Sequence, residues 1–368
     1  MKKRSSLLLI LSISLLAVFF FTCEKKQENL IKIGAVLPLT GKVSFLGVGE
    51  QNAMTLAIKY SNENLMKNKK LEIIYEDCQG ETDLAVTAAN KLINVDKCDI
   101  IIASTTNVAE GIIPLIEKSE KDIIMLALTI SPNITHKSNR IFRIWPNAFQ
   151  EREILSEYIN QKYNQIGVLY VESDYGILAK EIMDKLIGKK IKIAESYPRG
   201  SSDFKNILTK FADKDINAIS LISYPPEFIS IVKQLKELKL NLDIIGDIGF
   251  TFDFVINALG ELTNGIVFTA PKYTIDLEDN DYSKYFTNSY INKYNSKPSW
   301  NESFSHDNII FIANALKNYF EKQNILDAFQ SIKSFEGVNE IINMDNTGDS
   351  NSELVLVKLE SKKIVNVN

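Results

Sequence analysis

Beyond its first 30 residues, the chain alternates short apolar runs with amphipathic segments, and this alternation limits the possible folds more than any other feature. A short apolar run between turn residues is typical of a buried strand, and an amphipathic segment indicates a helix with one face against a sheet. Strands that alternate with helices pair in parallel, because each helix returns the chain to the same end of the sheet. The sequence therefore predicts an α/β fold built on parallel sheets.

The alternation occurs in two successive series. The first predicts strands at 31–37, 71–76, 99–103 and 122–127 and helices at 49–62, 82–95 and 107–118. The second predicts strands at 165–171, 190–196, 217–222, 242–246 and 266–269 and helices at 177–187, 203–213 and 226–238. An extended segment at 141–145, helices at 281–294, 304–320 and 326–334, and a strand at 354–359 complete the prediction. A chain of this length usually forms more than one core, and no Gly/Ser/Pro-rich linker separates the series. We therefore predict two doubly wound parallel-sheet lobes, interleaved by several chain crossings.

The N-terminus has the features of an export signal. Residues 2–4 are basic, and 7–21 form an apolar run of fifteen residues with only two serines, which is shorter than the roughly 20 residues of a membrane span. We predict a signal peptide over 1–22 and an exported protein that faces the periplasm or the cell exterior. Cys23 predicts a lipidated first residue of the mature chain, with 23–30 as lipidated cysteine and tether. Plain cleavage and an uncleaved anchor are the alternatives.

The charge and the motif content exclude several classes of function. Without residues 1–22 the chain keeps 39 of its 42 basic residues against 46 acidic ones, a net charge of −7. With no basic patch, we expect no nucleic-acid partner. The two histidines, His136 and His306, have no metal-ligand spacing, and no Walker loop, Gly-x-Gly-x-x-Gly or Gly-x-Ser-x-Gly motif occurs. The sequence predicts a protein that is not an enzyme and holds no cofactor or metal.

Two cysteines remain after Cys23. Cys78 follows the predicted strand 71–76, whereas Cys98 precedes the strand 99–103. In a parallel sheet these are opposite ends, about five residues or roughly 16 Å apart, and a disulfide needs Cα atoms within about 7 Å. We predict that both thiols are unpaired.

A series of short motifs along the chain is similar to those of one known family. The strand and turn Ile33–Gly41 (IGAVLPLTG) are followed by further motifs in order: 76–80 (EDCQG), 85–92 (AVTAANKL), Ser131-Pro132, Phe142-Arg143, 174–176 (DYG), 202–204 (SDF), His306-Asp307, 335–337 (FEG) and 345–349 (DNTGD). Over residues 31–360 the chain resembles the type I periplasmic binding proteins of the leucine/isoleucine/valine-binding family.

The resemblance implies two lobes joined by three crossings, with the ligand held in the cleft between them and enclosed when the lobes close. Lobe 1 would contain 31–146 plus 272–350, and lobe 2 would contain 147–271 plus 351–368. The implied protein is a monomer that binds an amino acid, branched-chain or similar, and delivers it to an ABC transporter permease.

In lobe 1, the candidate ligand residues follow predicted strands. Ligands of open parallel sheets lie beyond the carboxyl ends of the strands, near helix N-termini that favour anions, and 104–107 (STTN) lies at such a point. Thr105 and Thr106 are candidates, although a helix cap alone also explains these residue types. The resemblance places Thr106 where the family has a serine that contacts the ligand's α-carboxylate.

Two further positions in lobe 1 depart from the family. Ile130 occupies the position of a contact threonine, with Thr129 and Ser131 on either side, so either the loop is shifted by one residue or the contact is lost. Leu46 occupies the position of an aromatic residue, with Phe45 beside it. We include Thr129, Ser131 and Leu46 as candidates.

In lobe 2, the candidates rest on the resemblance. Tyr175 matches the family's contact tyrosine, and the alternative is an exposed aromatic in a turn. Asp247 matches a carboxylate that pairs with the ligand's α-ammonium, and the alternative is an aspartate that shapes a Gly-flanked turn. Tyr224 is a candidate wall of the pocket.

Two other roles fit the same fold. A ligand-sensing lipoprotein would signal to a membrane partner without feeding a permease, and a structural surface lipoprotein would bind no small solute. The sequence favours solute capture for an importer and keeps the sensing role as the alternative.

Overall fold

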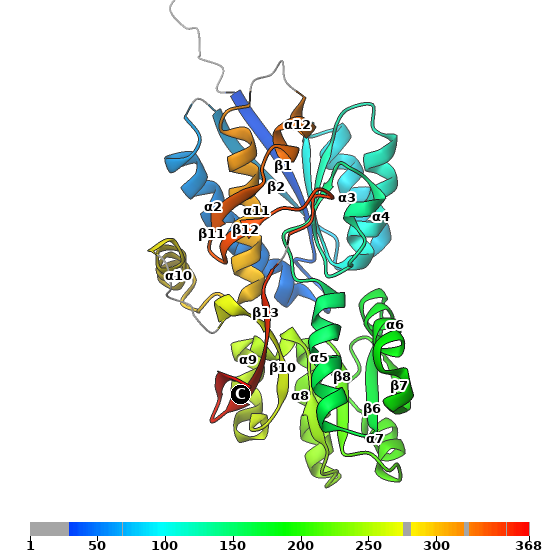
Figure 1. Ribbon diagram of the computed structural model, residues 1–368. Coiled ribbons are helices and arrows are strands. Elements are labelled where there is room, and N and C mark those ends of the chain that lie inside the picture. The colour runs from blue at the N-terminus through cyan, green and yellow to red at the C-terminus, as the bar shows by residue number, and fades with distance from the viewer. Residues whose placement is uncertain (1–28, 68, 275–280, 320–323, 351, 368) are drawn as a thin grey trace, which may run out of the picture.

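The computed structural model describes residues 29–367 except 68, 275–280, 320–323 and 351. Two α/β lobes lie end to end (Figure 1), which confirms the predicted fold class. The predicted signal peptide 1–22, Cys23 and most of the tether lie outside the described residues, and β1 begins at Asn29. None of the helices in the described part of the chain is long and apolar enough to cross a membrane.

Lobe 1 is built on a five-stranded sheet in which every pair of neighbours is parallel. Its strand order is β2-β1-β3-β4-β5, and three helices connect the first four strands. The elements are β1 (Asn29–Leu37), α2 (Ser44–Asn64), β2 (Lys69–Asp77), α3 (Thr82–Asn94), β3 (Ile100–Ser104), α4 (Thr106–Lys118), β4 (Ile124–Leu128), η1 (Thr135–Lys137) and β5 (Ile141–Phe142).

Lobe 2 is built on a seven-stranded sheet of order β14-β13-β10-β9-β8-β6-β7. Strands β6 to β10 are parallel, and β13 and β14 add an antiparallel edge. The elements are α5 (Ala148–Lys162), β6 (Ile166–Glu172), α6 (Asp174–Ile187), η2 (Gly188–Lys190), β7 (Ile191–Pro198), α7 (Lys205–Ala212), β8 (Ala218–Ile222), α8 (Pro225–Glu237), β9 (Asp243–Ile245), η3 (Ile248–Thr251), α9 (Asp253–Leu259), η4 (Gly260–Thr263), β10 (Val267–Pro271), β13 (Leu354–Glu360) and β14 (Lys363–Asn366).

The segment between β10 and β13 returns to lobe 1. It contains η5 (Lys272–Thr274), α10 (Asp281–Tyr294), α11 (Trp300–Leu316), α12 (Ile325–Gln330) and the hairpin of β11 (Ser334–Gly337) and β12 (Glu340–Asn343). Helices α10 and α11 pack against α2 (Figure 1). The chain thus passes between the lobes three times, after β5, after β10 and after β12. The exact lobe limits given above stay a prediction.

A buried ion pair joins the first and third crossings. The Nε of Arg143 donates to Oδ1 of Asp349 over 2.8 Å, and its Nη2 bonds the second carboxylate oxygen. Backbone hydrogen bonds flank the pair, from Arg143 N to Gly348 O and from Ser350 N to Arg143 O. The Arg143 side chain is fully buried, so the motifs Phe142-Arg143 and 345–349 meet where the chain crosses between the lobes.

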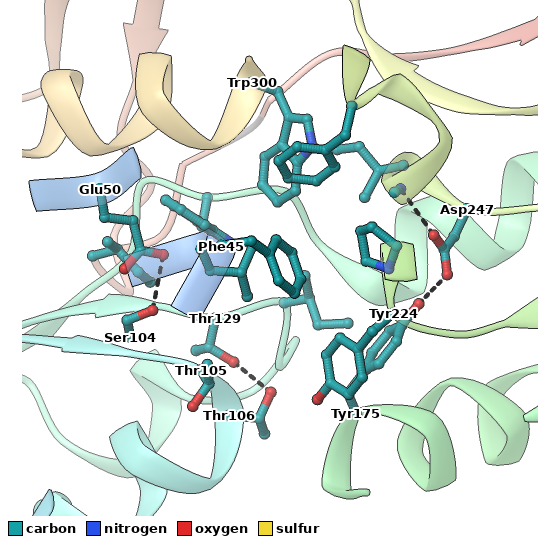
Figure 2. A pocket seen from close by; sticks show the side chains of 18 of the residues that line it. Phe45, Glu50, Ser104, Thr105, Thr106, Thr129, Tyr175, Tyr224, Asp247 and Trp300 are labelled. Atoms are coloured by element: carbon teal, nitrogen blue, oxygen red, sulfur yellow. Dashed lines mark hydrogen bonds between the residues drawn. The ribbon is translucent and has the colours of Figure 1, made fainter. Parts of the chain in front are cut away.

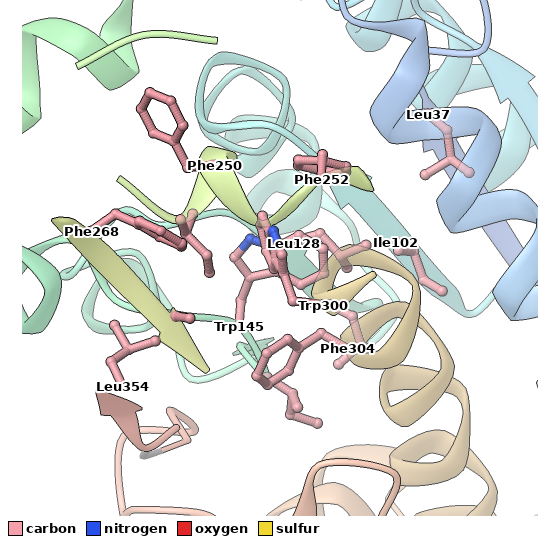
Figure 3. Close-up of a cluster of buried hydrophobic side chains, with 14 of the residues drawn as sticks. Leu37, Ile102, Leu128, Trp145, Phe250, Phe252, Phe268, Trp300, Phe304 and Leu354 are labelled. Carbon is pink, nitrogen blue, oxygen red and sulfur yellow. The ribbon is translucent and has the colours of Figure 1, made fainter. Parts of the chain in front are cut away.

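One continuous apolar core extends through both lobes. At the crossings, Trp145 and Trp300 of lobe 1 lie with ring centroids 5.3 Å apart, and Trp300 also contacts Phe252 of lobe 2 at 6.1 Å (Figure 3). Aromatic pairs of this geometry add stabilisation beyond the area that they bury. The lobes are therefore joined by packed side chains as well as by the chain.

The structure corrects some of the predicted elements. Helix α5 was missing from the prediction, because Glu151 and Arg152 on its buried face interrupt the apolar stripe of Ala148, Leu155 and Ile159. The helix predicted at 304–320 begins at Trp300 and ends at Leu316. Its start is fixed by a capping box, in which the Ser299 hydroxyl accepts from backbone N–H groups of the first turn and the Glu302 carboxylate accepts from Ser299 N.

Cys78 and Cys98 are free and buried, which confirms the prediction that they are unpaired. Burial raises the pKa of each thiol to about 11. Since the thiolate is the reactive form, neither cysteine should react readily in the folded protein.

We expect both thiols to react with a maleimide after denaturation without reductant, and to react far more slowly in the native protein at pH 7. Labelled peptides identified by mass spectrometry provide the measurement. A protected pair in the denatured, unreduced protein would contradict the assignment.

We expect Asp349→Asn to lower the free energy of unfolding by about 3–5 kcal/mol, because it leaves the Arg143 guanidinium buried without its counter-charge. Urea unfolding provides the measurement. The matched control is Glu237→Gln, which removes the partner of Lys205 from an ion pair with both side chains more than half exposed and should cost less than about 1 kcal/mol. Equal losses of unfolding free energy in the two variants would show that the ion pair of Arg143 and Asp349 stabilises the protein no more than an exposed ion pair does.

Candidate functional site

A cavity of about 100 Å³ lies between the lobes, where the carboxyl ends of the two sheets face each other. Both lobes contribute to its lining (Figure 2). The lining residues are Phe45, Leu46, Glu50, Ser104, Thr105, Thr106, Leu128, Thr129, Ile130, Trp145, Glu151, Tyr175, Ser223, Tyr224, Pro225, Asp247, Ile248, Gly249, Phe252 and Trp300. This is the position in which open parallel sheets bind ligands.

The lobe 1 wall is the N-terminus of α4 and the end of β4. Thr106 is the first residue of α4, and its hydroxyl lies 2.8 Å from the hydroxyl of Thr129. The first N–H groups of a helix have no partner within it and carry partial positive charge. Two hydroxyl groups beside a helix N-terminus form a suitable site for a carboxylate.

Thr105 holds an unusual backbone conformation at this wall. Its φ is 78° and its ψ is 155°, a region that is essentially confined to glycine because the Cβ of other residues clashes there. Its side chain does not cap the helix and instead bonds Asn107 Oδ1 over 3.1 Å. Capping therefore does not explain Thr105, and backbone strain of this kind is typical of ligand sites.

The lobe 2 wall is centred on the buried carboxyl group of Asp247. Its Oδ1 accepts a hydrogen bond of 2.9 Å from Gly249 N, and its Oδ2 accepts from the hydroxyl of Tyr175 and, over 3.5 Å, from Ser223 N. The bond to Gly249 is the cap of the short η3 turn. Asp247 thus shapes its turn with one oxygen and directs the other toward Tyr175 and the cleft (Figure 2).

Charged residues of α5 lie behind Asp247. Glu151 accepts from Ile248 N over 3.0 Å and from the Thr269 hydroxyl over 2.8 Å, and it pairs with Arg152. Burial and the neighbouring Glu151 charge raise the pKa of Asp247 to about 7, although the Arg152 guanidinium opposes the shift. Glu151 thus pairs directly with the buried arginine, whereas Asp247 is affected by the arginine only through its charge. With all three groups charged, the cluster carries one excess negative charge.

The rest of the cavity is mostly apolar. Phe45 of lobe 1 meets Phe252 of lobe 2 edge to face at 5.7 Å, and Leu46, Trp145 and Trp300 continue this wall. A polar pair interrupts it, because Ser104 Oγ donates to Glu50 Oε1 over 2.9 Å. Burial, together with the nearby Glu302 carboxyl group, raises the pKa of Glu50 to about 8, although the hydrogen bond from Ser104 opposes the shift.

The structure brings most of the predicted site residues together. Seven line the cavity, namely Leu46, Thr105, Thr106, Thr129, Tyr175, Tyr224 and Asp247. Ser131 lies behind it, where its N–H donates to the Thr129 hydroxyl and its carbonyl accepts from Arg143. Thr129 and Ile130 both line the cavity, and Thr129 supplies the hydroxyl that faces Thr106. A role for any of these residues in binding stays a prediction.

Several lining residues were missed by the sequence analysis. Glu50 lies on a helix that the pattern predicted but did not mark as facing the ligand, Glu151 lies on α5, which was not predicted, and the start of α11 with Trp300 was placed four residues too late. Ser104 lies in the predicted loop 104–107 but was not chosen as a candidate. Trp145 directly precedes Pro146 at the first crossing. Among the missed residues, it is the one whose place in the sequence indicated a position between the lobes. Charged residues on buried helix faces give no sign in the sequence that they face a cavity.

Comparison with known proteins identifies the family of this chain. The model of the periplasmic binding protein family matches residues 30–363. The chain belongs to the periplasmic binding protein family. A relative, the leucine-, isoleucine-, valine-, threonine- and alanine-binding protein of Pseudomonas aeruginosa, is 24% identical over 265 residues, which are 70% of this chain and 70% of the relative. The resemblance to the leucine/isoleucine/valine-binding family is confirmed, and the relatives are solute-binding proteins and not enzymes.

Solved structures of this family share the fold. The branched-chain amino acid transporter substrate-binding protein LivJ of Streptococcus pneumoniae, in complex with isoleucine, superposes with a TM-score of 0.82 at 24% identity and covers 91% of this chain and 98% of its own. A solute-binding protein of an ABC transporter from Rhodopseudomonas palustris, in complex with 3,4-dihydroxybenzoic acid, superposes with a TM-score of 0.80 at 21% identity. The match covers 90% of this chain and 94% of that protein. The fold thus accepts ligands with and without an ammonium group.

We expect the unliganded protein to lose stability as pH rises from 5 to 8. The pKa values of Glu50 and Asp247 are raised in the folded state, to about 8 and about 7. At a pH between these values and the ordinary carboxyl pKa of about 4, the folded protein therefore binds more protons than the unfolded chain. Stability then falls with pH. Glu302 contributes in the same direction, since burial raises its pKa.

Urea unfolding of the wild type and of Glu50→Gln at pH 5 and pH 8 measures this effect. The variant should lose less stability over this range than the wild type, by on the order of 1 kcal/mol or more, because it lacks one of the titrating groups. Identical pH profiles would show that Glu50 titrates normally.

Proposed function

We propose that this chain is an exported lipoprotein that captures a small amino acid between its lobes and delivers it to an ABC importer. The observation that carries the proposal is the pairing of opposite polar walls. Asp247 on lobe 2 faces a cavity whose lobe 1 wall is the N-terminus of α4 with the Thr106 and Thr129 hydroxyls. An ammonium group suits the Asp247 wall of lobe 2, and a carboxylate suits the helix N-terminus of lobe 1.

The charge of the lobe 2 wall favours an ammonium ligand over a simple carboxylic acid. Arg152 is fully buried and pairs with Glu151, so an ionised Asp247 has no cation in direct contact among the described side chains. A buried charge is costly without a partner. An α-ammonium group supplies that partner, whereas an aromatic acid has no cation to offer.

The size of the cavity also favours a small solute. An apolar protein cavity of about 150 Å³ accepts benzene, and this cavity measures about 100 Å³. A short aliphatic or polar side chain fits such a space more readily than an aromatic ring.

Contacts at the mouth of the cleft support capture by hinge closure. Arg199 of lobe 2 forms an ion pair with Glu81 of lobe 1, and Lys42 Nζ donates to the Arg199 carbonyl over 2.9 Å. These contacts join the lobes on the side opposite the crossings. A ligand that touches both lobes shifts the equilibrium toward this arrangement, because an open cleft offers it only one wall.

Export and lipidation rest on the N-terminal sequence. The apolar run at 7–21 and Cys23 predict a signal peptide and a lipid anchor. Delivery to a permease follows the role of the relatives. If the sensing role applies instead, deletion of the gene should leave uptake of the labelled solute unchanged, whereas an importer subunit is required for uptake.

We expect Asp247→Asn to weaken binding of the amino acid ligand by about 2–5 kcal/mol, because the variant cannot neutralise the buried ammonium. The ligand is first identified by a thermal-shift screen of the full chain in mild detergent against amino acids, short amides, small peptides, sugars and benzoates. Isothermal titration then gives the affinities of the two proteins. A ligand at 100 times its Kd adds about 2.7 kcal/mol of stability, which a melting scan detects.

The matched control is Asp184→Asn, an exposed aspartate of α6 that pairs with Lys180. It should leave the affinity unchanged. A loss below about 0.5 kcal/mol in Asp247→Asn would contradict the role of Asp247, and a benzoate or sugar as the sole hit would contradict the amino acid ligand.

A further inference from the structure

Glu50 presents an unused hydrogen-bonding atom at the cavity. It lies on α2, lines the cavity and is fully buried. Its Oε1 accepts from Ser104 Oγ over 2.9 Å, whereas its Oε2 has no hydrogen-bond partner among the described residues. A buried polar atom without a partner is costly, and most such atoms in folded proteins have one.

A second buried polar atom of the lining residues also has no hydrogen-bond partner among the described residues. Trp300 begins α11, which packs beside α2, and its indole Nε1 is buried without a partner in the described part of the chain. An indole N–H can only donate, so it requires an acceptor. The carboxyl group and the indole lie on neighbouring helices of lobe 1 and line the same cavity (Figure 2).

We propose that Glu50 selects a solute whose side chain carries a hydroxyl or carboxamide group, which bonds to the Oε2 of Glu50. This inference rests on the proposed function, because it concerns the side chain of the captured amino acid. It makes Glu50 a specificity residue, with Ser104 as the residue that positions it.

The chemistry of the wall favours these two groups. The pKa of Glu50 is about 8 because of burial and the nearby Glu302, so at neutral pH its carboxyl group is mostly protonated and neutral. Such a group both donates and accepts. A hydroxyl and a carboxamide do the same. A purely aliphatic side chain would leave these atoms without partners, and sites of this kind discriminate strongly against the analogue that lacks the polar group.

Isosteric ligand pairs test the inference. We would measure by isothermal titration the affinity of the full chain, in mild detergent, for threonine against valine and for asparagine against leucine. The members of each pair have nearly the same shape and differ in polarity. We expect the wild type to bind the polar member of at least one pair 10-fold more tightly or better.

Two variants of Glu50 connect that preference to the residue. Glu50→Met keeps the length of the side chain but removes its polar atoms, and should reduce the preference to 3-fold or less while binding the apolar member at least as well as the wild type. Glu50→Gln keeps a donor and an acceptor and should retain a preference of at least 3-fold. Binding of the apolar member by Glu50→Met also shows that this variant is folded.

The outcomes separate this inference from the proposed function. If the wild type binds the apolar members as tightly as the polar ones, or if Glu50→Met keeps the full preference, the inference is wrong and amino acid capture stands. If the wild type binds none of the four amino acids but binds another class of solute in the screen, the proposed function is wrong and the inference falls with it.

Discussion

The ion pair of Arg143 and Asp349 is the contact on which the arrangement of the lobes depends. It joins the first and third crossings, and backbone hydrogen bonds on both sides hold these segments in register. The same arginine donates to the carbonyl of Ser131, in the loop that carries Thr129. A single buried side chain therefore connects two of the crossings to the lobe 1 wall of the cleft.

The cleft shows why this fold suits capture of a zwitterionic solute. Each sheet brings the carboxyl ends of its strands to the cavity, and the two walls differ in charge because one is a helix N-terminus and the other a carboxyl cluster. Neither wall alone binds both ends of an amino acid. In the proposed function, binding energy therefore depends on the approach of the lobes, which would couple recognition to closure.

Several features of the cleft oppose the stability of the unliganded protein. Asp247 and Glu50 are buried carboxyl groups with raised pKa values, Arg152 has two nitrogens without partners among the described residues, and Thr105 holds a strained backbone. Other buried polar groups of lobe 1 vary, since Asp307 accepts from Val338 N and Asn339 N, whereas His306 Nδ1 and Asn308 Oδ1 also lack partners among the described residues. Two of the lining residues, Glu50 and Trp300, thus carry a buried polar atom without a partner among the described residues, and a ligand in the cavity could complete such atoms.

The sequence by itself determined the α/β class, the two series of strands and helices, the free cysteines and most of the candidate ligand residues. Apolar periodicity and the positions of loops after strands carry this information, because both follow from local geometry. The tertiary structure alone decided that α5 is a helix, that α11 begins at Trp300 and that Glu50, Glu151 and Trp300 reach the cleft. These residues are charged, or lie at a helix start, on faces that the sequence pattern does not mark as buried. Their role depends on which elements meet across the cleft, and that is a property of the folded chain.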